Sequence, residues 1–239
     1  MKEVKYYGIH ACQALAKHRS QDIIRLYLDE SNVKTFASLL KWCASQKKAY
    51  HIIPKQELDR VSDSIHHEGI CILAKEKKPL SEHAFRKAVP QGCLLYLDGV
   101  QNPHNLGSIL RTAAHFGIPY ILGDKLPSLS PSCCRIAKGA VELLSLVSLT
   151  KPLDTLRWLK EQGFAILATS SHRGQSLYQY NFPKKSIIAI GAESEGLGKA
   201  TERLATESLC IPGTGNVESL NVAVATALCL GEYSRQHPQ

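Results

Sequence analysis

The apolar positions in the first third of the chain alternate between two spacings, one typical of strands and one of helices. Segments 10–17 and 36–44 have apolar residues at helical spacing. Short apolar runs predict the strands of this region, which are 23–28, 50–53 and 70–74. Helices that alternate with strands predict a small α/β sandwich domain over residues 1–75.

The rest of the chain opens on a continuous apolar run at 93–98, which is typical of a strand buried on both faces of a parallel sheet. After it the pattern predicts strands at 119–122, 164–169 and 186–190, and helices at 105–116, 153–162 and 219–235. We therefore expect an α/β domain over 92–239, with a mostly parallel sheet and helices on both faces. The charged, proline-bearing stretch 76–91 is interpreted as a linker that holds a short helix.

Basic charge is concentrated in the first of these regions. The 239 residues carry a net charge of +8. Residues 1–79 hold 14 lysines and arginines against 9 acidic residues, whereas residues 91–239 hold 13 against 11. A basic balance permits a polyanion such as nucleic acid as a partner, but many basic proteins have no such partner.

Composition narrows the cellular setting. No apolar run approaches the roughly 18–20 residues that a membrane helix needs, and the first eight residues lack the apolar core of a signal peptide. We therefore expect a cytoplasmic protein that does not contact a membrane. The eight cysteines include no Cys-x-x-Cys pair, and the histidines complete no zinc spacing. We predict reduced cysteines in the core and no metal site.

Three glycine-bearing turns follow strands of the second region, at 98–111, 190–198 and 211–225. Ligands of open α/β sheets bind beyond the carboxyl ends of the strands, so these turns are the expected place for a site. In the first turn, Asn105 is predicted to cap the next helix, and Arg111 shares a helical face with His115. By spacing alone, a capped helix with a solvated arginine is the simpler interpretation.

The other two turns also leave alternatives open. Glycines at 190–198 allow a ligand to approach the backbone, but an ordinary strand-to-helix turn has them too. This segment lacks both the G-x-G-x-x-G spacing of a dinucleotide site and the Gly-Lys-Ser/Thr of a phosphate-binding loop. In the third turn, Ser219 or Asn221 is expected to cap the final helix. That helix is apolar nearly all round, so it is either a core helix that also reaches a subunit interface or a purely structural one.

Taken together, the three turns resemble the three motifs of the SpoU (TrmH-type) RNA 2′-O-methyltransferases of the SPOUT superfamily. The motif residues occur in the family's order and with the expected gaps over residues 93–235. They are Asn105, Gly107 and Arg111, then Gly191, Glu193, Gly196 and Leu197, then Ile211, Pro212, Gly215, Ser219, Leu220, Asn221 and Val222. One such motif is weak evidence, but three in order are highly specific.

Segments 8–15 and 66–70 of the front region resemble the L30e-like RNA substrate-binding domain that precedes many SpoU enzymes. The whole chain resembles the YfiF-like branch of the family. This resemblance implies a C-terminal SPOUT domain whose chain forms a deep trefoil knot, which is a rare exception to the usual topology rules. It also implies a homodimer that packs through the knot and the C-terminal helix.

The resemblance further implies that S-adenosylmethionine methylates a ribose 2′-hydroxyl in structured RNA. The implied catalytic residues are Arg111, Asn105, Ser219, Asn221 and Glu193. The implied cofactor-binding residues are Thr169, Gly191, Glu193, Gly196, Leu197, Ile211, Pro212, Gly215, Ser219 and Leu220. A guanidinium is protonated at ordinary pH, so we expect Arg111 mainly to hold an RNA phosphate and stabilise the developing oxyanion. A role as general base would need an unusual site.

Ribosomal RNA is favoured over transfer RNA because of the L30e-like front domain, and DNA is not expected as a partner. The residues expected to contact RNA are Arg19, Arg25, Lys47, Lys48, His66, His67 and Arg111. For each of the front residues taken singly, a solvated charged surface is an equally good interpretation.

Two motif positions depart from the family. Asn102 stands where an acidic residue usually precedes the proline, and Gly213 stands where a bulky residue usually follows Ile-Pro. A catalytically silent, knotted RNA-binding or ribosome-assembly factor is a further alternative, although the retained Arg111, Asn105, Ser219 and Asn221 disfavour it. A base-methylating SPOUT enzyme is another, and a nicotinamide-dependent oxidoreductase lacks its glycine fingerprint.

Overall fold

The computed structural model describes residues 2–88, 90–124, 126–127 and 129–238. The chain forms two compact units. The first contains residues 1–78 and 129–143, and the second contains 79–128 and 144–239. The segment 129–143 thus packs with the front of the chain, although in the sequence it lies inside the predicted 92–239 domain.

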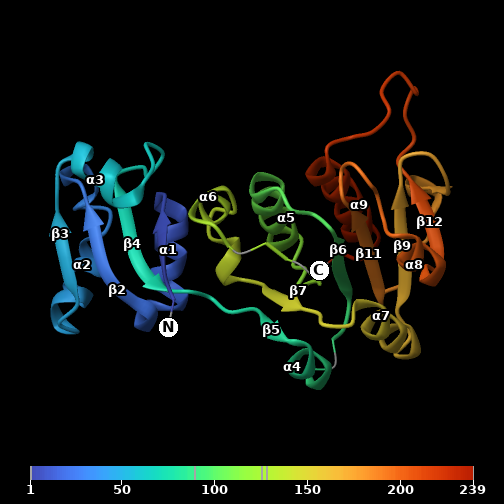
Figure 1. Ribbon diagram of the computed structural model, residues 1–239, viewed down its shortest axis with the longest axis horizontal. Helices are drawn as coiled ribbons and strands as arrows, with labels where there is room; N and C mark the ends of the chain where they lie inside the picture. The colour runs from blue at the N-terminus through green and yellow to red at the C-terminus, as the bar shows by residue number, and fades with distance from the viewer. Residues whose placement is uncertain (1, 89, 125, 128, 239) are drawn as a thin grey trace. The chain divides into compact units, whose positions relative to one another are not determined.

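A four-stranded mixed sheet forms the centre of the first unit (Figure 1). The strands stand in the order β1–β4–β2–β3, with β4 antiparallel to β1 and β2, and β2 parallel to β3. They are β1 (Glu3–Tyr7), β2 (Ile23–Leu28), β3 (Ala49–Ile52) and β4 (Ile70–Lys75). The helices are α1 (Ile9–His18), α2 (Ala37–Ser45), α3 (Lys55–Ser62) and α6 (Pro131–Ile136), with 3-10 turns η1 (Ser20–Asp22), η2 (Glu30–Asn32) and η3 (Ala140–Glu142). The expected α/β sandwich is confirmed.

Among the strands and α-helices of residues 2–78, β1 and α3 have no counterpart in the sequence prediction. Helix α3 is mostly polar, and its buried Leu58 packs on Tyr7 of β1 and Cys71 of β4. Strand β1 is only five residues long and starts with charged positions. Both elements are stabilised by contacts with distant parts of the chain, which override weak local patterns.

Helix α6 and turn η3 belong to this unit because they pack closely on α1 and β1. Gly139 shows how closely, since a Cβ built on it would lie 2.7 Å from the Cβ of Ala14 in α1. A larger residue would have to displace helix α1. Cys133 and Cys134 of α6 are buried in the same interior. Packing of this density holds the segment 129–143 to the first unit.

The second unit has an eight-stranded sheet in which every paired strand is parallel. The order is β10–β12–β9–β11–β6–β7–β8–β5. The strands are β5 (Leu80–Ser81), β6 (Cys93–Asp98), β7 (Tyr120–Gly123), β8 (Ser145–Ser148), β9 (Ala165–Ser170), β10 (Gln175–Ser176), β11 (Ser186–Gly191) and β12 (Glu207–Cys210). The helices are α4 (Glu82–Lys87), α5 (Pro103–His115), α7 (Pro152–Glu161), α8 (Lys199–Leu204) and α9 (Val222–Gln236), with the 3-10 turn η4 (Leu177–Gln179).

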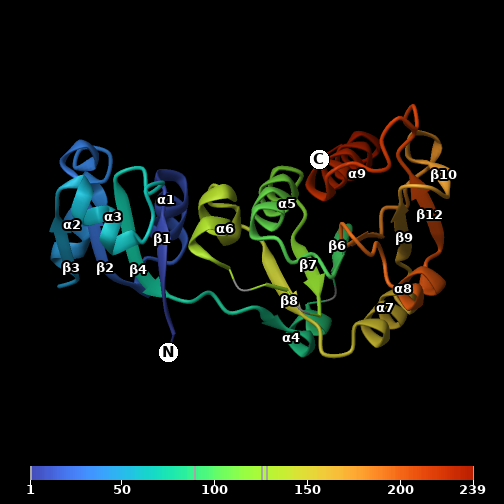
Figure 2. The same cartoon turned by 45° about the horizontal axis from the view of Figure 1, so that its top comes forward.

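Helices cover both faces of this sheet, as the sequence predicted (Figures 1 and 2). On one face, Phe85 of α4 and Leu156 and Leu159 of α7 pack against Leu94 of β6 and Ile187 of β11. Helices α5 and α9 lie side by side on the other face. Strands β6 and β11 are therefore buried on both sides, which explains their continuous apolar runs.

The stretch 76–91, interpreted as a linker, contains the expected short helix and also a strand. Strand β5 pairs with β8 at the edge of the large sheet. Ser81 caps α4, and Glu82 accepts hydrogen bonds from Thr155 at 2.6 Å and Arg86 at 2.8 Å. Most of this stretch is thus an ordered part of the second unit.

The cysteines behave as the sequence predicted. All eight are free thiols, and seven of them are buried. Burial raises the pKa of Cys71 to about 12, so this thiol stays protonated and unreactive. No helix in the described part of the chain is long and apolar enough to span a membrane.

Candidate functional site

Three side chains, one from each glycine-bearing turn, meet at the carboxyl edge of the parallel sheet. The Nδ2 of Asn105 donates to Glu193 Oε1 at 2.6 Å. The Nδ2 of Asn221 donates to Asn105 Oδ1 at 3.1 Å and to Glu193 Oε1 at 3.2 Å. Because β6 and β11 are parallel neighbours, the loops that follow them start side by side at the carboxyl ends of the two strands. We call these three residues the Asn–Glu–Asn cluster.

Asn102, not Asn105, caps helix α5. Its Oδ1 accepts from the backbone amides of His104 at 2.9 Å and Asn105 at 3.5 Å. Pro103 occupies the first helical position, where its missing N–H costs nothing. The prediction of an Asn105 cap was wrong because the helix starts earlier, and this leaves the Asn105 side chain free to reach Glu193. An amide oxygen at position 102 makes the capping bond that a carboxylate would make.

Asn221 caps helix α9, as expected. Its Oδ1 accepts from the backbone amides of Ala223 at 2.9 Å and Val224 at 3.3 Å. Its Nδ2 is the donor to the other two members of the cluster. The cap fixes the side-chain orientation, so the start of the last helix sets the geometry of the cluster.

Gly191 lies where β11 passes very close to the turn that follows it. A Cβ on Gly191 would lie 2.1 Å from the carbonyl carbon of Gly196. Ala192 and Gly196 exchange two backbone hydrogen bonds, at 3.1 and 2.9 Å, which close the turn. Glu193 stands on this turn, and Leu197 just after it is buried in the core of the second unit. Glycine at position 191 is thus required for the turn that presents Glu193.

Three further hydrogen bonds stabilise this edge of the sheet. Asp98, at the end of β6, accepts from the Gly198 amide at 3.1 Å and from the Thr201 hydroxyl at 3.0 Å. The Thr169 hydroxyl donates to the carbonyl of Ala189 in the neighbouring strand at 2.9 Å. Asp98 was not among the predicted site residues, although a carboxylate directly after a buried strand was a usable signal.

The third turn is an extended loop between β12 and α9, drawn in orange-red in Figure 1. It carries the predicted cofactor residues Pro212, Gly215, Ser219 and Leu220, which are exposed, and Ile211 at its start is half-buried. Within the described part of the chain, no backbone-to-backbone hydrogen bond involves residues 212–220. The loop therefore offers a row of free N–H and C=O groups to a ligand.

Arg111 is exposed on α5, six residues after Asn105. It forms no hydrogen bond or ion pair with any residue that the structure describes. His115, one turn later, is exposed as well. An arginine whose five donors are unused is free to bind an anion such as a phosphate.

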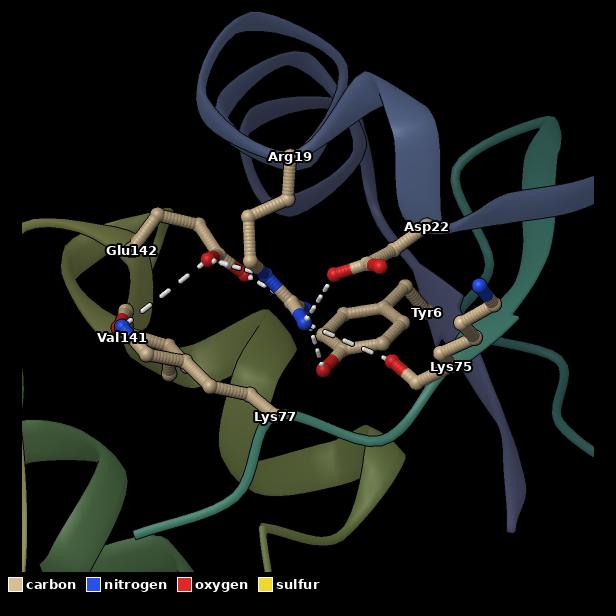
Figure 3. A network of polar contacts seen from close by, with 7 residues as sticks. All are labelled: Tyr6, Arg19, Asp22, Lys75, Lys77, Val141 and Glu142. Atoms are coloured by element: carbon tan, nitrogen blue, oxygen red, sulfur yellow. Dashed lines mark hydrogen bonds and ion pairs between the residues drawn. The ribbon is translucent and has the colours of Figure 1, made fainter. Parts of the chain in front are cut away.

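Arg19, predicted to contact RNA, is instead held inside the first unit (Figure 3). Its guanidinium binds both carboxylate oxygens of Glu142, at 2.7 and 3.2 Å, and Asp22 at 3.1 Å. It also donates to the Tyr6 hydroxyl at 2.9 Å and the Lys75 carbonyl at 3.4 Å. Burial raises the pKa of Tyr6 to about 12, so the phenol remains neutral. With these donors engaged, Arg19 is part of the fold rather than of a free surface.

His67 is also internal, with 1% of its surface exposed. Its Nδ1 accepts from the Gly69 amide at 2.8 Å, and its Nε2 lies 2.9 Å from Asp59 Oδ1. Because Nδ1 accepts, the proton belongs on Nε2, which donates to Asp59. The imidazole therefore stabilises the loop before β4 and presents no polar atom to a partner.

The other predicted RNA contacts lie on the surface of the first unit. Arg25, Lys47 and His66 are exposed. Arg25 donates to the Tyr27 hydroxyl at 3.1 Å, and the Tyr27 ring stacks on His51 with centroids 5.3 Å apart. Lys48 is half-buried and donates to the Ile23 carbonyl at 2.7 Å. Cations beside stacked rings are compatible with RNA binding, but solvated residues look the same.

The chain matches two protein-family models. Residues 92–231 match the SpoU rRNA methylase family, and residues 6–80 match the RNA 2′-O ribose methyltransferase substrate-binding domain. The first match covers more than half of the chain. The chain belongs to the SpoU rRNA methylase family. The two matched regions follow the order inferred from the motifs.

Similar proteins point the same way. The 23S rRNA (guanosine-2′-O-)-methyltransferase RlmB of Escherichia coli K12 is 35% identical over 238 residues, which cover 96% of this chain and 97% of RlmB. The uncharacterized tRNA/rRNA methyltransferase YfiF of E. coli O157:H7 is 34% identical over 238 residues, 99% of this chain and 69% of YfiF. This likeness to YfiF confirms the branch inferred from the sequence.

A solved structure confirms the fold. The SpoU methyltransferase AviRb of Streptomyces viridochromogenes, crystallised in complex with S-adenosylmethionine, superimposes with a TM-score of 0.79 at 20% identity. The match covers 98% of this chain and 90% of AviRb. Both units therefore have the architecture of a SpoU methyltransferase.

Proposed function

We propose that this protein transfers a methyl group from S-adenosylmethionine to a ribose 2′-hydroxyl in ribosomal RNA, in the cytoplasm. Family membership and the likeness to RlmB support the reaction and the kind of RNA. The observation that carries the proposal is the Asn–Glu–Asn cluster. Direct hydrogen bonds in this cluster join the three family motifs at one edge of the sheet. Asn105 and Glu193 are 88 positions apart in the sequence, Asn105 and Asn221 are 116 apart, and Glu193 and Asn221 are 28 apart.

The residues around the cluster fit the cofactor. S-adenosylmethionine has a base, a ribose and an amino-acid end, and it therefore needs many hydrogen-bond partners. The backbone groups of residues 212–220, of which only the Asn216 amide has a hydrogen-bond partner among the described side chains, supply such partners together with the turn after Gly191, without charged side chains. We assign the cofactor to this loop and turn, with Ile211, Gly215 and Leu220 among its contacts. The Thr169 proton is already donated to Ala189, so Thr169 would meet the cofactor only as an acceptor.

When bound, S-adenosylmethionine supplies a methyl group that passes to the ribose oxygen while the electrons of the carbon–sulfur bond stay on sulfur. The chain must hold the 2′-hydroxyl in line with that methyl group. Arg111, which pairs with none of the described residues, holds an RNA phosphate and stabilises the oxygen as its proton passes to solvent water. Asn105 and Asn221 orient the loops, and Glu193 is occupied by both amides and so acts as a positioning residue. Ser219 is exposed on the loop, where it can bond to cofactor or ribose.

We further propose a homodimer through the third turn and α9, with the chain knotted in this region. Val217, Leu220 and Val224 are 72%, 44% and 48% exposed. Burying apolar side chains of this size against a second copy is favourable, by about 25 cal/mol per Å². Sedimentation analysis of the full chain tests this, since a monomer at micromolar concentration would exclude the proposed dimer.

The function is tested by incubating the full chain with methyl-labelled S-adenosylmethionine and ribosomal RNA from cells that lack the protein. Digestion to nucleosides should place the label on a ribose 2′-oxygen. Label on a base, or in transfer RNA alone, would refute the proposal. Calorimetry with S-adenosylmethionine by itself separates an inactive protein that lacks the cofactor site from an active one given the wrong RNA.

A further inference from the structure

The first unit contains a cavity of about 500 Å³, and none of its lining residues belongs to the three motif turns. Its size is typical of small-molecule sites, which span about 300–1,000 Å³. The side chains of six lining residues can contact a ligand. Five of them are polar or charged and one is apolar: Asp29, Lys55, His66, Glu68 and Arg135, and Ile65. All of them belong to the same unit, since Arg135 is part of the segment 129–143.

The cavity lies where segments 8–15 and 66–70 come together, the two segments that resemble the L30e-like substrate-binding domain. The Gly8 amide donates to the His67 carbonyl at 3.2 Å, and the Ile9 amide donates to Glu68 Oε2 at 2.9 Å. Asn32 Nδ2 donates to the Glu68 carbonyl at 3.0 Å. These bonds hold Glu68 at a φ of 54°, a left-handed conformation that is uncommon for a residue other than glycine. Such conformations persist where the surroundings enforce them and are frequent at binding sites.

Arg135 supplies the main cationic group of the cavity. Its Nε is buried and has no hydrogen-bond partner among the described residues. Its aliphatic stem lies over Gly8, with Cγ 2.8 Å from where a Cβ would stand, so the side chain is fixed by packing. Because the Nε is buried, a ligand in the cavity meets only the terminal Nη groups of Arg135, and these N–H groups bind phosphate oxygens. Exposed Lys55, at the start of α3, lines the same cavity and adds a second positive charge.

The cavity also has carboxylates, so it does not fit a bare anion. Glu68 uses Oε2 for the Ile9 amide, and no described residue donates to its Oε1. Asp29 holds Ser31 at 2.6 Å and Asn32 at 3.3 Å through Oδ1. A free carboxylate oxygen accepts hydrogen bonds from N–H groups, and guanine carries such donors on its base-pairing edge. Ile65, 73% exposed, offers an apolar surface to a base.

We propose that this cavity takes one unpaired guanine nucleotide extruded from the RNA substrate. The nucleotide's phosphate binds Arg135 and Lys55, its N1–H and amino group face Glu68, and its ring lies against Ile65. The pocket would thus dock the RNA at a second point in the first unit. This inference rests on the proposed function, because the nucleotide comes from the RNA that is methylated.

The test uses the full chain and two RNA hairpins that differ by one bulged guanine, with a third in which the bulge is adenine. Fluorescence anisotropy at fixed salt should show about tenfold tighter binding of the guanine bulge than of the unbulged stem. Glu68→Gln keeps an oxygen for the Ile9 amide but replaces the free oxygen with a donor, so it should remove most of the preference for guanine over adenine. Arg135→Lys and Lys55→Gln should weaken binding of both bulges by about three- to tenfold.

Lys41→Gln is the matched control, because Lys41 is exposed on α2 and does not line the cavity. Bulged-RNA affinities of the three cavity variants equal to that of Lys41→Gln would overturn the proposal. So would equal competition by inorganic phosphate for all three hairpins, which would show an anion site only. Methylation of ribosomal RNA by the wild-type chain, measured in parallel, tells the two proposals apart. If it persists while the cavity variants bind normally, only the cavity proposal fails; if it is absent while guanine bulges bind selectively, only the methylation proposal fails.

Discussion

Two polar clusters join distant parts of the chain in this molecule, and they differ in burial and in charge. In the first unit, Arg19 binds Glu142, 123 positions away, and their side chains are 16% and 2% exposed. In the second unit, the Asn–Glu–Asn cluster spans up to 116 positions, but Glu193 and Asn221 are exposed and the cluster holds one charge.

The difference separates fold stabilisation from site construction. A buried ion pair that is fully hydrogen-bonded is costly to break, because the partner that remains is a buried charge with neither a counter-charge nor water to solvate it. Exposed amides exchange partners with water at little cost, so the Asn–Glu–Asn cluster can adjust when a ligand arrives. No described residue accepts a hydrogen bond from Arg111, which lies near the second cluster in sequence, whereas the donors of Arg19 are engaged within the fold.

Removing Arg111 should give the largest effect on activity. In Arg111→Ala, the initial rate of RNA methylation should fall by about 10²–10³-fold, because a group that stabilises the developing oxyanion is lost. Stability should change by no more than about 0.5 kcal/mol, since the side chain is exposed and unpaired. S-adenosylmethionine affinity, measured by calorimetry, should stay the same. A variant with normal methylation would show that Arg111 is a solvated residue.

Removing the charge of Glu142 should give the largest effect on stability. In Glu142→Gln, the free energy of unfolding should fall by about 3 kcal/mol, because Arg19 and Lys77 lose a buried counter-charge. Urea denaturation measures this. Asp154→Asn is the control, since its ion pair with Arg157 has both side chains 55% exposed and should be worth less than about 0.5 kcal/mol. Equal losses in the two variants would remove the distinction between buried and exposed clusters.

The sequence predicted the second cluster far better than the first. Asn105, Glu193 and Asn221 each lie in a short pattern of glycines directly after a strand or before a helix, and strand ends converge in a parallel sheet. The sequence analysis assigned the cap of α5 to Asn105, whereas Asn102 makes it. The helix starts at Pro103, before the first apolar position of its helical pattern. Nothing local indicates that Arg19 would meet Glu142, or that α6 would pack on β1, because such contacts depend on tertiary packing. For the same reason His67 and Arg19 looked like surface cations.

A methyl group on Gly191 should have an intermediate effect. In Gly191→Ala, the new Cβ would meet the backbone of Gly196, so the turn must open at a cost of about 2 kcal/mol. Cofactor affinity should fall with it, because the turn presents part of the proposed site. Gly231→Ala is the control: its Cβ would meet Phe116 at an ordinary 3.7 Å, and alanine is preferred inside a helix. Unchanged cofactor binding in Gly191→Ala would remove this turn from the site.

The smallest effect should come from the amides of the exposed cluster. Asn221→Ala removes the cap of α9 and should cost about 1 kcal/mol of stability, and Asn105→Ala should cost less because it caps nothing. A double-mutant cycle between them isolates their direct hydrogen bond, with a coupling energy of about 0.5 kcal/mol expected for an exposed contact. A coupling of several kcal/mol would mean that the second cluster is as rigid as the first. In that case the motif loops would be held in one arrangement before any ligand binds, and cofactor and RNA would have to fit a preformed site.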